Sequence, residues 1–158
     1  MKVGSTQFLR LAVILMGIPV LAIGIFGLVY LPSHPANPDF AHLLYPIVIV
    51  MYVSVIPYFG ALIQSFKLLN LIDKNEAFSQ MSVNALKKIK YFAITISGLY
   101  VIAVPFVIQL AELDDAPGLT IVGLVPILAS LVIAVFAAVL QRLLQEAINI
   151  KSENDLTV

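Results

Sequence analysis

The sequence predicts an all-α integral membrane protein in which four transmembrane helices form a single bundle. Hydrophobic residues make up 61% of the 158-residue chain and charged residues only 11%, and the mean hydropathy is +1.03. Soluble domains carry roughly a quarter charged residues, so this chain has too little polar surface to cover its apolar side chains in water. The length predicts one domain, residues 1–158.

Four apolar stretches are long enough to cross a bilayer, which takes about 20 residues of helix. They cover residues 11–31, 43–63, 91–111 and 119–140, and none contains Asp, Glu, Lys or Arg. The first follows Lys2 and Arg10, as the apolar region of a signal peptide would. It is longer than that region usually is, and "LPSHPANP" offers no small-x-small cleavage pattern. We therefore expect a retained helix.

The basic residues predict the orientation of the four spans. All of them fall before the first span, between the second and third, or after the fourth: Lys2, Arg10, Lys67, Lys74, Lys87, Lys88, Lys90, Arg142 and Lys151. Lys and Arg are retained on the cytoplasmic side. We expect a multi-pass protein of the bacterial cytoplasmic membrane with both termini inside. The lysines at positions 87, 88 and 90 would also attract anionic lipid headgroups.

Residues 64–90 are expected to form the cytoplasmic tip of a helical hairpin. The periodicity of the second span continues past residue 63, and Asn75 is suited to a left-handed stop. Ser79 is placed to cap the third helix by accepting a hydrogen bond from a backbone N–H. Phe78 and Val83 have the spacing of a hydrophobic staple. Helices two to four are thus predicted to project two to three turns into the cytoplasm.

Residues 141–158 form a cytoplasmic tail that continues the fourth helix with an apolar stripe. These projecting stripes either pack on one another or offer a groove to another protein. The last segment, "KSENDLTV", is interpreted either as a docking segment or as a frayed terminus. We expect the extended end of the fourth helix to pack beside the hairpin tip.

Each span contains a proline near its middle, and proline kinks a helix by removing a hydrogen bond. These are Pro19, Pro57, Pro105 and Pro126. They are either static kinks or hinges for a conformational change. We expect Ser54, Ser97 and Ser130 to satisfy the carbonyl groups that the prolines leave free.

The chain lacks the residues that catalysis usually needs. It has no cysteine, no Asp, Glu, Lys, Arg or His inside a span and no catalytic motif of a known class, so we predict a non-enzyme without a cofactor. His34, Asp39 and His42 share one outer loop and are weak candidates for metal ligands. Direct binding to nucleic acid is not expected.

Two segments resemble a known family, the YoaS-like bacterial membrane proteins of unknown function. They are "LLNLIDKNEAFSQMSVNALKKIKYFAI" and the closing "LLQEAINIKSENDLTV". The matching positions are Leu71, Ile72, Asp73, Phe78, Ser79, Leu86, Glu146, Glu153, Asn154, Asp155, Leu156, Thr157 and Val158. Asn75 stands where glycine is expected, and Ala77 where proline is common. The family is often encoded beside a small Xre-type helix-turn-helix regulator, so the resemblance implies a regulatory membrane partner.

The preferred function is therefore regulation or sensing through a cytoplasmic partner, such as a small helix-turn-helix transcription regulator. Small-molecule transport, or immunity to bacteriocins or antimicrobial peptides, is the alternative, and a purely structural role also stays open. Besides the lipid bilayer, a second copy of the chain is a possible partner. The candidate partner-binding residues are Asp73, Phe78, Ser79, Lys87, Glu146, Glu153, Asn154, Asp155 and Leu156.

Overall fold

The computed structural model describes residues 3–35 and 37–157, and its regular structure there is entirely helical. The helices are α1 (Val3–Ser33), α2 (Pro38–Asp73), α3 (Gln80–Leu113) and α4 (Gly118–Thr157). Each one is long and apolar enough to cross a membrane. The all-α prediction with four membrane spans is confirmed.

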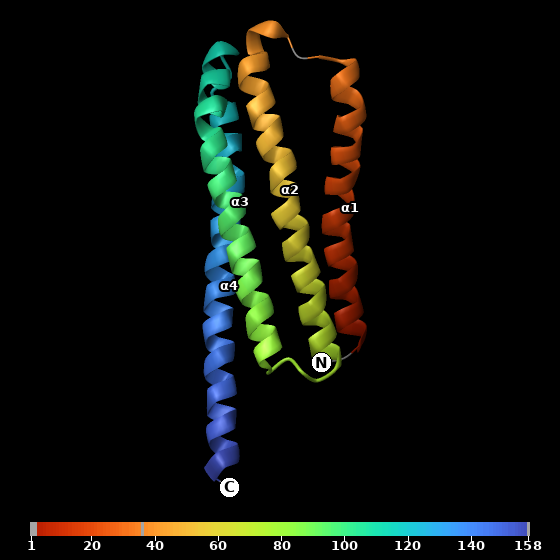
Figure 1. The fold of residues 1–158 in the computed structure, drawn as a ribbon, viewed down its shortest axis with the longest axis vertical. Coiled ribbons are helices and arrows are strands. Elements are labelled where there is room, and N and C mark those ends of the chain that lie inside the picture. Colours follow the sequence, from red (N-terminus) through yellow and green to blue (C-terminus); the bar gives the residue numbers. More distant parts are fainter. Residues whose placement is uncertain (1–2, 36, 158) are drawn as a thin grey trace.

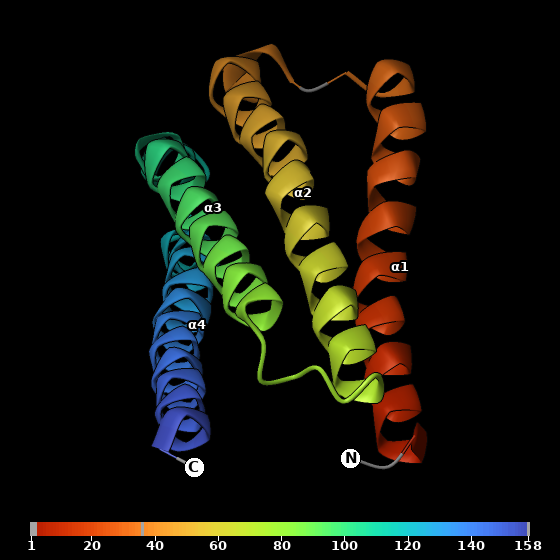
Figure 2. The ribbon, with the colours of Figure 1, turned by 60° about the horizontal axis from the view of Figure 1, so that its bottom comes forward.

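Consecutive helices run antiparallel, with α1, α2 and α3 side by side and α4 partly behind α3 in the view of Figure 1. In the described part of the chain, α1 packs on α2, α2 on α3 and α3 on α4, and no other pair of helices makes contact. Two views show α1 at one side of the molecule and the pair of α3 and α4 at the other (Figures 1 and 2). Helix α3 is therefore the centre of the best-packed part.

Small side chains allow α2, α3 and α4 to approach closely, as is common where membrane helices pack. Ala93, Ser97 and Ala103 are buried on α3, and Ala134 and Ala137 on α4. A Cβ atom at Gly60 of α2 would lie 2.8 Å from the ring of Phe92. The absence of a side chain at this glycine thus sets the distance between α2 and α3.

Helix α1 is attached more loosely than the other three. Thr6 and Gly17 are its only buried positions among those described. Two tyrosines of α2 donate hydrogen bonds to its backbone, Tyr58 to the carbonyl of Met16 at 2.6 Å and Tyr52 to that of Gly24 at 2.8 Å. A carbonyl on α1 thus holds each tyrosine hydroxyl inside the apolar region.

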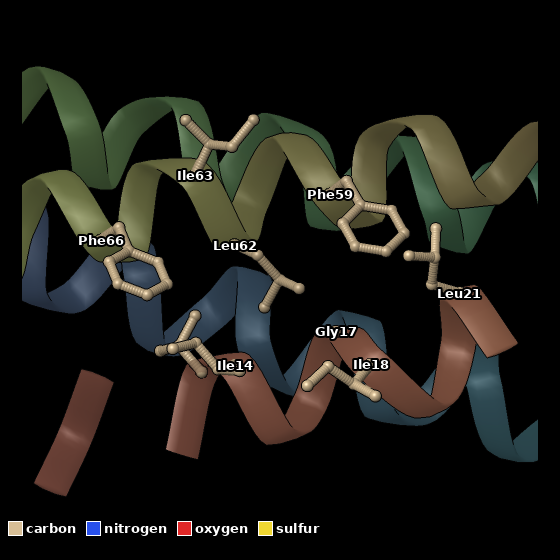
Figure 3. Close-up of a pocket in the computed structure, with 9 residues that line it drawn as sticks. Ile14, Gly17, Ile18, Leu21, Phe59, Leu62, Ile63 and Phe66 are labelled. Carbon is tan, nitrogen blue, oxygen red and sulfur yellow. The ribbon is translucent and has the colours of Figure 1, made fainter. Parts of the chain in front are cut away.

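An apolar cleft of about 250 Å³ lies between α1 and α2 on the side of the chain termini. Side chains of the two helices face one another across Gly17 (Figure 3). The lining residues are Val13, Ile14, Gly17, Ile18, Leu21, Phe59, Leu62, Ile63 and Phe66. Such a lining suits a lipid acyl chain better than a polar solute.

All four mid-span prolines lie within continuous helices. The prediction about the serine hydroxyls is wrong for two of the serines. Ser130 donates to the carbonyls of Pro126 and Ile127, whereas Pro126 frees the carbonyl four residues before it. Ser54 likewise donates to Met51 and pairs with the hydroxyl of Tyr100 on α3 at 3.0 Å. These hydroxyls reach only the nearest carbonyl or a neighbouring helix. Whether the prolines act as hinges stays a prediction.

Candidate functional site at the basic end

The candidate site is the end of the molecule that carries the first residues of α1, the turn between α2 and α3, and the last residues of α4. We call it the basic end, because all described Lys and Arg residues lie toward it. Lys2 and Val158 fall outside the described residues.

The turn at residues 74–79 begins with a well-formed helix C-terminus. Asn75 has a positive φ of 59°, as predicted for the left-handed stop. The N–H of Glu76 bonds to the carbonyl of Leu71 at 2.8 Å, and that of Asn75 to Ile72 at 3.1 Å. These two bonds form a Schellman motif. The turn is therefore fixed by the backbone of α2 itself.

Ser79 is the N-cap residue of α3, as predicted, but its side chain makes a different bond. It forms no capping bond, because its hydroxyl donates instead to the carbonyl of Glu76 at 2.7 Å. The prediction of an accepting Ser79 side chain is wrong. The hydroxyl thus closes the turn internally and accepts from none of the first N–H groups of α3.

Phe78 is the most prominent feature of the turn, because 62% of it is exposed. The predicted staple partner, Val83, is buried and only 3% exposed. Contact between Phe78 and Val83 in a staple stays a prediction, and most of the Phe78 side chain is left exposed in any case. Met81, close by on the first turn of α3, is 47% exposed. Phe78 and Met81 together form an apolar surface beyond the membrane spans, which we call the tip patch.

Asp73 connects the basic end to α1. Its Oδ2 lies 2.6 Å from Nη2 of Arg10, and the same Nη2 donates to Oδ1 of Asn70 at 2.5 Å. The side chains of Arg10 and Asp73 are 23% and 21% exposed. Sequence reasoning assigned Arg10 to orientation and Asp73 to partner binding. It missed the pair, although both residues belong to the same predicted side of the membrane.

Lys90 makes a polar contact between α3 and α4 at the basic end. Its Nζ donates to Oε1 of Gln141 at 3.1 Å and lies 4.9 Å from the centre of the Tyr91 ring. A lysine at the end of the apolar span is thus held by one amide and one aromatic face. Lys87, a candidate for partner binding, is exposed on the same helix.

The start of the cytoplasmic tail packs beside the α3 part of the hairpin tip, where Gln141 meets Lys90, but the last turns of α4 do not, so that prediction holds only in part. In the described part of the chain, α4 contacts α3 alone, and every residue from Asn149 to Leu156 is exposed (Figure 1). The reason is register. Because Gln141 lies level with Lys90, the last turns of α4 extend past the start of α3. Glu153, Asn154, Asp155 and Leu156 therefore lie beyond the start of α3 and apart from the turn, whereas Glu146 lies level with the first turns of α3.

The opposite end of the molecule carries the weak metal candidates. Among the described residues, no three His, Cys, Asp or Glu side chains come together as a metal site. His34 stacks on Tyr30 with ring centres 4.3 Å apart. Asp39 lies in the first turn of α2, where Asn37 accepts its backbone N–H at 3.1 Å. The prediction that His34, Asp39 and His42 share one loop is wrong, because His34 follows α1 whereas Asp39 and His42 lie in α2.

Comparisons with known proteins identify the family. The model of the family described as "Protein of unknown function (DUF2975)" matches residues 31–158. The chain is also 56% identical over 156 residues to "Uncharacterized membrane protein YoaS" of Bacillus subtilis (strain 168), which covers 98% of each chain. The chain belongs to this family. The resemblance to YoaS-like membrane proteins is thereby confirmed. No solved structure matches.

The family match covers the three well-packed helices and leaves out most of the loosely attached α1. It begins at residue 31 and so includes all of α2, α3 and α4, but only the last residues of α1. The matched region contains the 74–79 turn, the tip patch and the whole of α4. Arg10 lies outside this region and its partner Asp73 inside it.

Proposed function

We propose that the protein is a non-enzymatic membrane regulator that binds a soluble partner through the tip patch. The observation that carries this proposal is the exposure of Phe78, which is 62% accessible on a turn that the backbone fixes. Exposed aromatic residues on rigid supports are typical anchors of protein interfaces. A turn that served only to connect two helices would not need one.

The distance of the tip patch from the bilayer supports a protein partner over lipid. α3 begins at Gln80, and its apolar span begins only at Tyr91. A helix rises 1.5 Å per residue, so the start of α3 lies about 15 Å beyond the span. Phe78 is therefore too far from the hydrocarbon to act as a membrane anchor.

We place the basic end in the cytoplasm of a bacterial cell membrane, because Lys and Arg are retained there. The proposed partner is a small helix-turn-helix regulator, as the family resemblance implies. Membrane binding would then hold the regulator away from DNA.

The transport or immunity alternative would have to use the cleft between α1 and α2. That cleft is lined by apolar side chains, and a transported polar compound would need polar groups along its path. An acyl chain is its natural occupant. We therefore base the proposal on the tip patch.

The experiment is photocrosslinking in living cells from a photoreactive residue that replaces Phe78. Phe26 is the matched control, because it is similarly exposed at 67% but lies within the first span. We expect one discrete protein adduct from position 78 and lipid adducts from position 26. Met81→Ala should reduce the protein adduct. Lipid adducts alone from position 78 would refute the proposal.

A further inference from the structure

Helix α4 has two apolar seams, and only one of them is covered. The covered seam faces α3 and includes Ile127, Ser130, Ala134 and Ala137, all buried. The second seam lies one residue earlier at each step, about 100° around the helix. Its members, spaced alternately by three and four residues, are Ile133, Phe136, Leu140, Leu143, Ala147, Ile150 and Asn154. We call it the open seam.

The open seam continues beyond the part of α4 that a bilayer would cover. Phe136 and Leu140, 63% and 52% exposed, lie within the apolar span. Leu143 and Ile150, 58% and 64% exposed, follow Gln141 and Arg142 in the basic end. In a bilayer the first pair would face lipid, whereas Ile150, about 15 Å beyond the end of the apolar span at Leu140, would face water. Apolar side chains in such a repeat are usually covered by another helix.

We propose that the open seam binds a second copy of the chain, so that two α4 helices form a parallel coiled coil. In heptad terms Leu140, Ala147 and Asn154 occupy a positions, while Leu143 and Ile150 occupy d positions. An Asn at a single a position is a feature that fixes register and strand number in parallel coiled coils. Copies inserted with the same topology can pair side by side only in parallel.

The charges flanking the open seam favour pairing with an identical helix. Glu146 is at a g position and Lys151 at the following e position, and these two positions meet across a parallel pair. Glu146 would therefore face Lys151 of the partner subunit, and the symmetry gives this pair twice. Within its own chain, Glu146 lies 3.7 Å from Arg142 with both side chains largely exposed. Such a surface pair is weak and leaves Glu146 available.

The packing of α4 on α3 leaves room for this arrangement. α3 covers the seam of Ala134 and Ala137, and the second copy would cover the face next to it. Because helices in bundles commonly have two neighbours about a quarter turn apart, neither contact displaces the other. The inference concerns α4 alone and does not depend on the function proposed for the tip patch.

Disulfide crosslinking in native membranes tests the proposal, since the chain has no cysteine of its own. Ile150→Cys and Asn154→Cys place a thiol on the open seam. Asn149→Cys and Ser152→Cys are controls, because both residues are exposed at the same height on other faces. With mild oxidation we expect covalent dimers from the two seam positions. The two control positions should give few or none. Equal crosslinking at all four positions, or none at any, would overturn the proposal.

Charge reversal separates a specific pair from random collision. In the Ile150→Cys background, Glu146→Lys would place like charges opposite each other and should reduce the yield of the covalent dimer. Lys151→Glu should do the same, and the double reversal should restore the dimer. Seam crosslinks that neither single reversal reduces would overturn the assignment of Glu146 and Lys151. Membrane levels of the Ser152→Cys protein with the same reversals show whether each variant still folds.

Discussion

At the scale of single residues, the contact between Arg10 and Asp73 is the main polar link between α1 and α2 at the basic end. Nη2 of Arg10 serves both Asp73 and Asn70. Nε of Arg10 and Oδ1 of Asp73 are buried without a protein partner in the described structure. The pair thus uses one N–H where a guanidinium and a carboxylate can share two. We therefore expect the pair to contribute to the free energy of unfolding as one charged hydrogen bond would, and not as a two-bond pair.

We expect this pair to contribute about 1–2 kcal/mol to the free energy of unfolding, because it is partly buried. A double-mutant cycle with Arg10→Met and Asp73→Leu, followed by unfolding in mixed detergent micelles, measures this coupling. The exposed pair Arg142 and Glu146, at 84% and 61% exposed, is the control. Its coupling should be about 0.5 kcal/mol or less. Equal couplings for the two pairs would contradict a structural role for Asp73.

At the scale of elements, the sequence predicted where the helices are and how α2 ends. Apolar runs located four spans, and Asn75 ends α2 in the left-handed conformation, because few residues other than glycine tolerate it. The same motif ends α3 at Asp115, with a φ of 50°. Side-chain partners were less predictable. The Ser79 hydroxyl donates to the backbone carbonyl of Glu76. The spacing of residue types along the sequence does not show that this carbonyl lies within reach.

The contact between α2 and α3 depends on the missing side chain of Gly60. A Cβ there would lie within 3.1 Å of three ring atoms of Phe92, so Gly60→Ala should lower stability by about 1–3 kcal/mol. Gly98→Ala is the control, because nothing lies within 4 Å of its Cβ position. Alanine should raise helix stability there by up to about 1 kcal/mol. The midpoint of thermal unfolding in detergent should fall for Gly60→Ala and rise for Gly98→Ala. Shifts of the same sign for the two variants would contradict this packing.

At the scale of the whole molecule, the order of packing was beyond sequence reasoning. Each span is apolar on all sides, so no stripe indicates which face meets another helix and which meets lipid. The pattern alone could not place α1 on α2 only, or leave the end of α4 without a neighbour in its own chain. It did predict that the described Lys and Arg residues gather at one end. The opposite end, at the start of α2 and the end of α3, carries Asp39, Glu112, Asp114 and Asp115.

This charge separation predicts one topology, with the basic end inside the cell. Glu112→Cys reports on one end, and Gln80→Cys and Ser152→Cys on the other; all three residues are exposed. In intact cells we expect a membrane-impermeant maleimide to label only Glu112→Cys. The other two should react only after permeabilisation. Labelling of Gln80→Cys from outside would place the tip patch beyond the reach of any cytoplasmic regulator. It would exclude the proposed partner, yet leave the pairing of α4 intact, because parallel pairing requires only that all copies share one orientation.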